Sequence, residues 1–178
     1  MELSKAIEAR RSVRHYDASK TVTREQVEEL ISAAIEAPSW KNSQTARYYC
    51  VLSEEMRERF RAECLPEFNA KNCEGAALIV TAFVANRSGF RRDGNPDNEC
   101  ENGWGFYDLG LHNENLLLKA ADMGLATLVM GIRDSAAIRQ LLSIPETQII
   151  ASVIAVGYPA EAPEKPKRKS PEDIAKFF

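Results

Sequence analysis

The chain has 178 residues, of which 44% are hydrophobic and 28% are charged. This length suits one domain, and this composition excludes a mainly disordered, collagen-like or low-complexity protein. Lys and Arg together number 23 against 26 for Asp and Glu, which gives a net charge of −3. The chain therefore has no overall positive field that would attract a polyanion. We therefore expect no nucleic-acid partner.

The cysteine pattern bears on metals and on the redox compartment. Four cysteines form no Cys-x-x-Cys pair, and the chain has only two histidines, which argues against a zinc site and against a disulfide framework. The N-terminus lacks a basic stretch followed by an apolar run, and no apolar run approaches the roughly 18 residues that span a bilayer. We therefore expect a cytoplasmic protein with free thiols, no metal and no membrane partner.

Two helices are predicted in the first forty residues. Residues 3–9 have apolar side chains at helical spacing and lead into a basic stretch, residues 10–17. Thr23 and Gln26 have the spacing of a capping box. The helix that they begin should end near Ala37, because the residue before a proline is pushed out of the α region. Its apolar stripe consists of Val27, Leu30, Ile31, Ala34 and Ile35.

The middle of the chain predicts two strands around a charged helix. Residues 47–52 are rich in strand formers, and Ser53 should cap a helix that runs to about residue 61. Residues 76–84 are an almost continuous apolar run, typical of a strand buried on both faces. Residues 86–105 show no periodicity, so they form a lid, a binding loop or a disordered excursion.

The last third predicts a long helix and two more strands. Residues 106–123 are apolar around most of the helical circumference, so this helix should be buried centrally or against a second subunit. Gly124 should end it, with a strand over residues 125–132. Ser135 should cap a short helix, and residues 149–156 should form the last strand.

A tail follows the last strand. Residues 161–171 are rich in proline and charge, and residues 173–178 form a short amphipathic piece. Because Ile174, Phe177 and Phe178 are apolar, we expect the tail to pack against another protein surface. With no internal repeat and no second core, we expect residues 1–178 to form one α+β domain.

Two basic clusters stand out. Arg10, Arg11 and Arg14, with the hydroxyls of Ser12 and Ser39, could bind a phosphate, because the arginine fork matches its oxygens. The second cluster is in the tail and comprises Lys165, Lys167, Arg168 and Lys169. Each cluster taken alone is more typical of a solvated surface than of a binding site. Residues 38–44, a polar segment after a well-formed helix, add side chains that a heteroaromatic ligand would partner.

Several common site motifs are missing. The sequence has no G-x-x-x-x-G-K-[ST] phosphate loop, no G-x-G-x-x-G after a strand and no G-x-S-x-G elbow. Two histidines leave few bases for a nucleophilic triad. These observations disfavour hydrolases.

Four segments, in this order, resemble the nitroreductase family of flavin-dependent oxidoreductases. They are Ala9-Arg10-Arg11-Ser12-Val13-Arg14-His15-Tyr16, then Ala37-Pro38-Ser39-Trp40-Lys41-Asn42-Ser43-Gln44, then residues 108–131, and finally Gly157-Tyr158-Pro159 with Lys167-Arg168-Lys169. The chain departs from the family pattern at Thr45, where proline is frequent, and at residues 126–129, where relatives commonly have Gly-Thr-Cys-Trp.

The resemblance implies a three-layer α+β fold with a central, mainly antiparallel sheet flanked by helices, in an intertwined homodimer. Residues 160–178 would form an extended tail on the partner subunit, and FMN would lie at the interface. The implied phosphate and ribityl contacts are Arg10, Arg11, Ser12, Arg14 and, from the tail, Lys167, Arg168 or Lys169. The implied isoalloxazine contacts are Pro38, Ser39, Asn42 and Gln44, with the backbone around Val129, Met130 and Gly131.

The resemblance also implies a reaction. NADH or NADPH would give a hydride to flavin N5, and an electron-poor acceptor such as a nitroaromatic or a quinone would then take its place in a ping-pong cycle. No side chain needs to act as an acid or base, so no catalytic residue is assigned. Alternatives with the same fold are reductive dehalogenation, flavin fragmentation, and a non-catalytic flavin carrier or redox sensor.

The unpatterned loop is the natural place for acceptor choice. Residues 87–104 combine flat apolar surface with positive charge, since they include Phe90, Arg91, Arg92 and Trp104. Such a mixture suits aromatic acceptors that carry an anionic group. A surface loop without a role in substrate binding fits the same residues.

Overall fold

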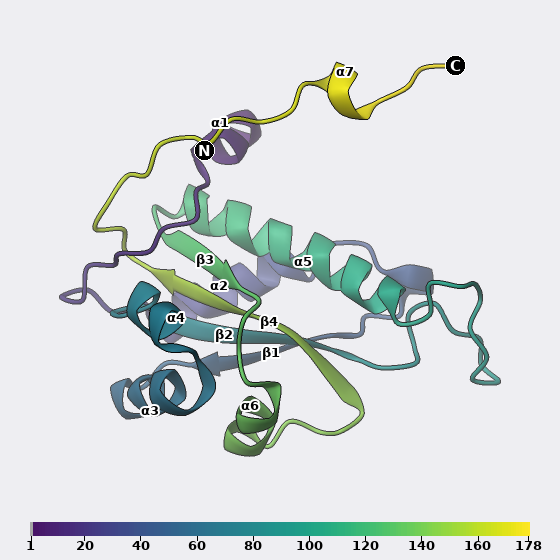
Figure 1. Cartoon of the computed structure of the whole chain (residues 1–178), viewed down its shortest axis with the longest axis horizontal. Helices are drawn as coiled ribbons and strands as arrows, with labels where there is room; N and C mark the ends of the chain where they lie inside the picture. The colour runs from purple at the N-terminus through teal and green to yellow at the C-terminus, as the bar shows by residue number, and fades with distance from the viewer. Residues whose placement is uncertain (1) are drawn as a thin grey trace.

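A computed structural model describes residues 2–178. Four strands form one antiparallel sheet in the order β1-β2-β4-β3 (Figure 1), with β1 Ala46–Val51, β2 Ala77–Val84, β3 Ala126–Met130 and β4 Gln148–Gly157. The helices are α1 Leu3–Ala9, α2 Arg24–Ala34, the 3₁₀ turn η1 Trp40–Asn42, α3 Glu54–Cys64, α4 Glu67–Asn72, α5 Gly103–Asp122, α6 Ser135–Leu142 and α7 Pro171–Ile174. The predicted α+β class with a central antiparallel sheet is confirmed.

The sheet separates two apolar cores, which gives the molecule three layers. Side chains alternate across β2, so Leu78 and Val80 pack with Phe60 of α3 and Ile138 of α6. On the other face Ile79 packs with residues of α2 and α5. Seven of the eight residues of β2 are buried, as the continuous apolar run predicts for an inner strand covered on both faces.

The predicted starts of α2 and α3 are confirmed. Thr23 and Gln26 form a complete capping box at the start of α2, and Ser53 accepts a hydrogen bond from the Met56 N–H at the start of α3. The prediction for α6 is wrong by one residue. Asp134, not Ser135, is its N-cap, because the Asp134 carboxylate accepts the backbone N–H groups of both Ala136 and Ala137.

The ends of several elements differ from the sequence prediction. Helix α2 ends at Ala34, three residues before Ala37, and β3 is shorter than the predicted residues 125–132. Helices η1 and α4 have no counterpart in the prediction. In the tail a helix covers Pro171–Ile174 and overlaps the amphipathic piece at residues 173–178 only in part, since Pro171 suits a first helical turn and Ser170 and Asp173 form a capping box.

Helix α5 begins at Gly103, three residues before the predicted start, and ends before Gly124, which has the left-handed φ of 72° expected of it. Gly105 faces the Phe83 ring so closely that a Cβ there would overlap it. The helix is buried on one face only. Phe106 and Tyr107 remain 50% and 60% exposed, so a single chain leaves an apolar face of α5 uncovered.

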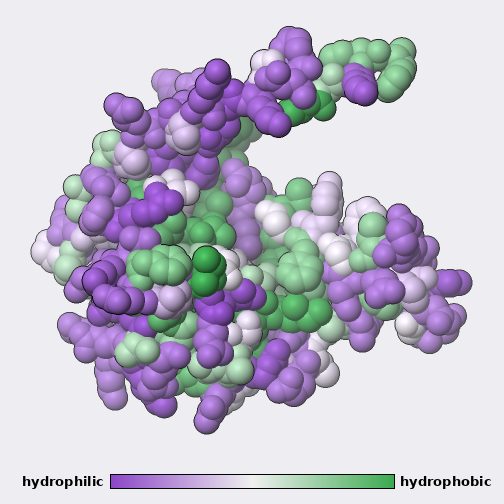
Figure 2. Space-filling model, viewed as in Figure 1, coloured by the Kyte–Doolittle hydropathy of each residue, from purple (hydrophilic) through white to green (hydrophobic). Residues whose placement is uncertain are grey.

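The tail leaves the body of the molecule. After β4 it passes the N-terminal helix and projects as an arm (Figures 1 and 2). Its apolar Ile174, Phe177 and Phe178 are 73%, 89% and 115% exposed. Apolar surface of the body lies in the recess beneath this arm (Figure 2). Among residues 2–178, no helix combines the length and apolar character needed to cross a bilayer.

Candidate functional site

The basic stretch after α1 lies against the first half of β3. Ser12 forms a parallel bridge with Thr127, and the Val13 N–H donates to the Thr127 carbonyl at 3.0 Å. The buried Tyr16 hydroxyl donates back to the Val13 carbonyl at 2.9 Å. These bonds fix the backbone of residues 12–16. Arg14 within this stretch, and Arg10 and Arg11 just before it, therefore belong to an anchored loop.

Glu161 ties the start of the tail to the same loop. Its carboxylate accepts the Arg14 backbone N–H at 3.0 Å, and its Oε2 lies 2.7 Å from Nδ1 of His15. These two contacts lower the pKa of Glu161, the Arg14 bond most. The Ala160 N–H also donates to the His15 carbonyl at 2.9 Å. The N-terminal loop and the tail therefore form one joined structure.

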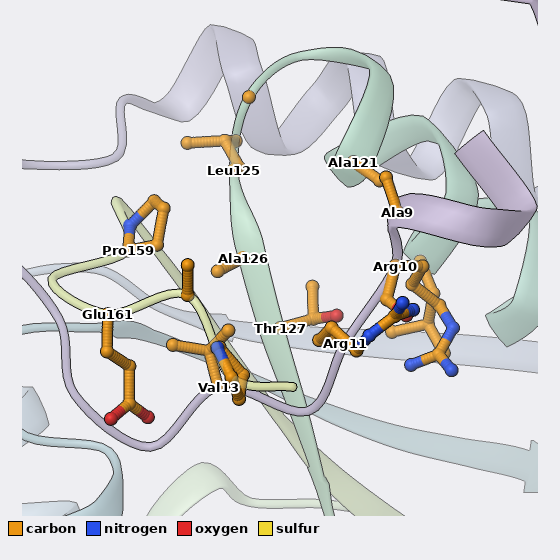
Figure 3. Close-up of a pocket in the computed structure, with 14 residues that line it drawn as sticks. Ala9, Arg10, Arg11, Val13, Ala121, Leu125, Ala126, Thr127, Pro159 and Glu161 are labelled. Atoms are coloured by element: carbon orange, nitrogen blue, oxygen red, sulfur yellow. The ribbon is translucent and has the colours of Figure 1, made fainter. Parts of the chain in front are cut away.

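A pocket of about 310 Å³ lies beside this joined structure. Arg10 and Arg11 border it, together with the end of α5, the start of β3 and the tail from Pro159 to Pro163. Figure 3 shows the two arginines on one side of the pocket and Glu161 on the other. Among the described residues the Arg10 guanidinium has no hydrogen-bond or ion-pair partner, and Arg11 donates only to the Arg10 carbonyl. Two uncompensated guanidinium groups at a pocket suit an anionic ligand.

The second polar segment, residues 38–44, lies at the other end of α5. The Trp40 backbone N–H donates to Oδ2 of Asp108 at 2.9 Å, and the Ser88 hydroxyl donates to the same oxygen at 2.6 Å. Asp108 is only 4% exposed, so this carboxylate is a buried anchor for the segment.

The backbone of this segment is unusual. Lys41, Asn42 and Gln44 have left-handed φ values of 49°, 54° and 48°. The Gln44 N–H donates to the Ser39 hydroxyl at 3.0 Å, which closes the turn. Left-handed residues other than glycine carry strain that the surroundings must hold, and such residues cluster at functional sites. The exposed side chains of Asn42 and Gln44 have no hydrogen-bond partner among the described residues and remain available to a ligand.

One chain does not bring the predicted site residues together. Asp108 holds the second segment near the start of α5, whereas Ala121, thirteen positions later, borders the arginine pocket. At 1.5 Å per residue, the two groups lie roughly 20 Å apart along the helix. The sites predicted on one chain therefore fall into two groups at opposite ends of α5.

The remaining predicted residues are placed as follows. Val129 is 46% exposed and Gly131 is exposed, but Met130 is only 2% exposed and its side chain packs in the core. Lys167, Arg168 and Lys169 are exposed on the arm, where Arg168 donates to the Pro166 carbonyl at 3.2 Å. Among the described residues, no hydrogen bond or ion pair joins this basic tail to Arg10 or its neighbours, so a single chain does not form the shared cluster.

Sequence reasoning missed the groups that hold the site. Thr127 and Glu161 border the arginine pocket, and Asp108 and Ser88 anchor residues 38–44. A buried aspartate in an otherwise apolar helix was the available signal for Asp108, because a buried carboxylate needs donors. Nothing in the local sequence marks Glu161.

A family model described as the nitroreductase family matches residues 7–92 and 67–158. A protein of Methanothermobacter thermautotrophicus, provisionally named NADH dehydrogenase/NAD(P)H nitroreductase, is 31% identical over 169 residues, covering 92% of this chain and 80% of that protein.

Solved structures share the fold. A nitroreductase family protein from Streptococcus pneumoniae superposes with a TM-score of 0.83 at 19% identity, covering 99% of this chain and all of that one. A protein from Exiguobacterium sibiricum, provisionally described as a nitroreductase and solved in complex with FMN, has a TM-score of 0.82 at 21% identity. The superposition covers 100% of this chain and 98% of the Exiguobacterium sibiricum chain.

Proposed function

This chain belongs to the nitroreductase family, and from that premise we propose that it binds FMN and passes a hydride from NAD(P)H to an electron-poor small molecule. The single observation that carries the proposal is the pair of uncompensated guanidinium groups, Arg10 and Arg11, at a pocket beside an anchored loop. A flavin phosphate supplies the anionic oxygens that these groups lack. The FMN in the Exiguobacterium sibiricum structure supports the choice of cofactor.

The donor set fits this cofactor at both ends. Ser12, Arg14 and the arginine pair would hold the phosphate and ribityl chain, with Lys167, Arg168 or Lys169 completing the positive charge. Pro38, Ser39, Asn42 and Gln44 would line the isoalloxazine, and the backbone of residues 129–131 would lie against its other part. Bound FMN supplies hydride chemistry at N5, which no amino-acid side chain provides.

The protein's own contribution is position and electrostatics. The Asp108 carboxylate holds the Trp40 backbone, and Ser39 closes the turn, so Asn42 and Gln44 are presented in a fixed orientation. Amide donors aimed at the pyrimidine edge would stabilise negative charge that develops there. No general acid or base is assigned, in keeping with hydride transfer at the cofactor.

The separation of the two groups supports a homodimer. An isologous pair would bring the start of one α5 to the end of the other, so each site would draw residues 10–14 from one subunit and residues 38–44 from its partner. The uncovered face with Phe106 and Tyr107, and the apolar end of the arm, would be buried in the same interface. This arrangement gives the tail the packing partner that its composition predicts.

Light scattering tests the homodimer. We expect the purified protein to have the mass of two chains and Tyr107→Asp to shift it towards the monomer. Phe68→Asp is the matched control, because Phe68 is 51% exposed on α4, away from α5. A monomeric wild-type protein that still binds FMN would contradict the shared site.

Anaerobic reduction tests the function. The purified protein should be yellow or take up added FMN, and NADH or NADPH should bleach the flavin band without oxygen. Adding a nitroaromatic or quinone should restore the band and support steady turnover. A colourless protein that fails to bind FMN would refute the proposal, and bound flavin that neither nucleotide reduces would favour a carrier or sensor.

A further inference from the structure

A second cavity lies on the outer side of the turn at residues 40–43. It has a volume of about 500 Å³, within the range of small-molecule sites, and the first part of the long loop, residues 86–94, forms its other wall. The cavity therefore joins a segment placed at the flavin ring to the loop for which the sequence left the role open.

The long loop is held against the turn at two points. The Ser43 and Ser88 hydroxyls lie 2.8 Å apart, and Nζ of Lys41 lies 2.6 Å from Oδ2 of Asp97. The turn also contacts the start of α5, where the rings of Trp40 and Trp104 lie 4.4 Å apart.

Bonds within the loop fix its shape as well. The Asp97 N–H donates to the Gly89 carbonyl at 2.7 Å, and the Arg91 N–H donates to the Asn95 carbonyl at 2.8 Å. Because of these bonds, the described loop is an ordered wall of the cavity.

The lining of this cavity is strongly cationic. Lys41, Arg87, Arg91 and Arg92 all border it. The nearby carboxylates are Asp97, which is engaged by Lys41 and lies 4.0 Å from Nε of Arg91, and Asp93, which accepts the Asn95 N–H. The Lys41 bond lowers the pKa of Asp97, and the Asn95 N–H lowers that of Asp93.

Both acids are therefore ionised at neutral pH, and two positive charges remain uncompensated. The side chains of Arg87 and Arg92 have no hydrogen-bond or ion-pair partner within residues 2–178. These two guanidinium groups, on a fixed wall and five positions apart, present ten N–H donors without an acceptor.

We propose that this cavity is a subsite for an anionic oxygen group, a carboxylate or a phosphate, on the small molecule that reacts at the site, with Arg87 and Arg92 as its specificity determinants. Guanidinium forks bind such groups through paired, charge-assisted hydrogen bonds. The half-buried Phe90 offers a flat apolar surface beside them for an aromatic ring. The subsite rests on the proposed function, because residues 38–44 border the flavin only if the chain binds one.

Two acceptors that differ in one charge test the subsite. We would compare kcat/KM for 4-nitrobenzoate with that for neutral 4-nitrobenzamide in the wild type, in Arg87→Gln and in Arg92→Gln. Each variant should lower the benzoate-to-benzamide ratio by about tenfold, the loss of one charge-assisted contact. Arg59→Gln is the control, because Arg59 is an exposed arginine of α3 outside this cavity, and it should leave the ratio unchanged.

The anionic group could come from the nucleotide instead of the acceptor. NADPH carries a 2′-phosphate that NADH lacks, so the same variants would be assayed with both donors and the neutral acceptor. A fall confined to the benzoate ratio places the carboxylate of the acceptor in the cavity, and a fall confined to the NADPH-to-NADH ratio places the phosphate there. Unchanged ratios in both comparisons would overturn the subsite.

Equilibrium binding separates this proposal from the proposed function. Calorimetric titration of 4-nitrobenzoate should give a dissociation constant about tenfold higher for Arg87→Gln and Arg92→Gln than for the wild type, with weaker binding as salt rises. If the protein took up no flavin, the function would fail while this titration still decided the subsite. Equal affinity for all variants in an active flavoprotein, together with an unchanged NADPH-to-NADH ratio, would overturn the subsite and leave the function standing.

Discussion

The backbone N–H of Trp40 and the carboxylate of Asp108 are joined by a 2.9 Å hydrogen bond across 68 positions of sequence. This bond attaches a turn with left-handed residues to the buried face of the longest helix, at the end where the apolar face of α5 is uncovered. The Ser88 hydroxyl shares the same carboxylate oxygen, so the turn and the long loop depend on one anchor.

Asp108→Ala should destabilise the protein and loosen this turn. Removing the carboxylate leaves the Trp40 N–H without its acceptor and takes the charged acceptor from the buried Ser88 hydroxyl, so we expect the free energy of unfolding in urea to fall by about 2–4 kcal/mol. The two tryptophans, Trp40 and Trp104, are in contact, so their emission should shift to longer wavelength.

Glu58→Ala serves as the control for Asp108→Ala. Glu58 is exposed on α3 and, within residues 2–178, its one polar contact is with Arg61 at 4.0 Å, so its removal should change the free energy of unfolding by under about 0.5 kcal/mol. An Asp108→Ala protein with wild-type stability and wild-type emission would show that Asp108 is not an anchor.

Arg10→Ala and Arg168→Ala should each weaken FMN binding. Both residues are placed at the phosphate in the proposed function, and a charge-assisted hydrogen bond contributes about 1.5–3 kcal/mol, which corresponds to roughly a ten- to hundredfold rise in the dissociation constant. Flavin fluorescence titration measures it. Lys71→Ala, at an exposed Lys–Glu pair on α4, should bind FMN as the wild type does, and unchanged affinity in both arginine variants would contradict the shared phosphate site.

Gly105→Ala tests the packing of α5 on β2. A Cβ at this position would overlap the Phe83 ring, and Phe83 is fully buried, so the strand or the helix must shift. We expect the variant to lose about 1–3 kcal/mol of stability in denaturant unfolding. Gly103→Ala, on the same helix, would place its Cβ 3.6 Å from Cys100, an ordinary contact, and should be neutral or slightly stabilising. Equal stability of the two variants would argue against the close approach.

The contact between Glu161 and the N-terminal loop should make stability depend on pH. The folded pKa of Glu161 lies below its ordinary value of 4.5, chiefly because the Arg14 N–H donates to it. A group with a lowered folded pKa stabilises the native state at pH above its unfolded pKa, and this stabilisation disappears as pH falls through the folded pKa. The wild type should therefore be more stable than Glu161→Gln at neutral pH.

Unfolding of the two proteins in urea at a series of pH values measures this difference. It should disappear once the pH is well below 4.5, where the Glu161 carboxyl is protonated. Glu164→Gln is the control, because Glu164 is an exposed carboxylate of the same tail, and its pH profile should match that of the wild type. A constant difference at all pH values would exclude the ionic contribution.

Local sequence rules predicted much of the fold because they act within a few residues. The capping box of Thr23 and Gln26, the cap at Ser53 and the stop at Gly124 each depend on neighbours at most three or four positions away. The apolar run of β2 predicted an inner strand for the same reason. The prediction failed where two residues compete for one role, as Asp134 and Ser135 do at the start of α6.

The sequence by itself determined most of the secondary structure, the α+β class and, through its four ordered segments, the family and the candidate cofactor residues. Only the tertiary structure decided which partners hold them: Thr127 against the arginine loop, Glu161 against Arg14, and Asp108 against Trp40. It also placed the two halves of the candidate site at opposite ends of α5. These relationships join residues far apart in sequence, and such contacts depend on how whole elements pack, which no local pattern specifies.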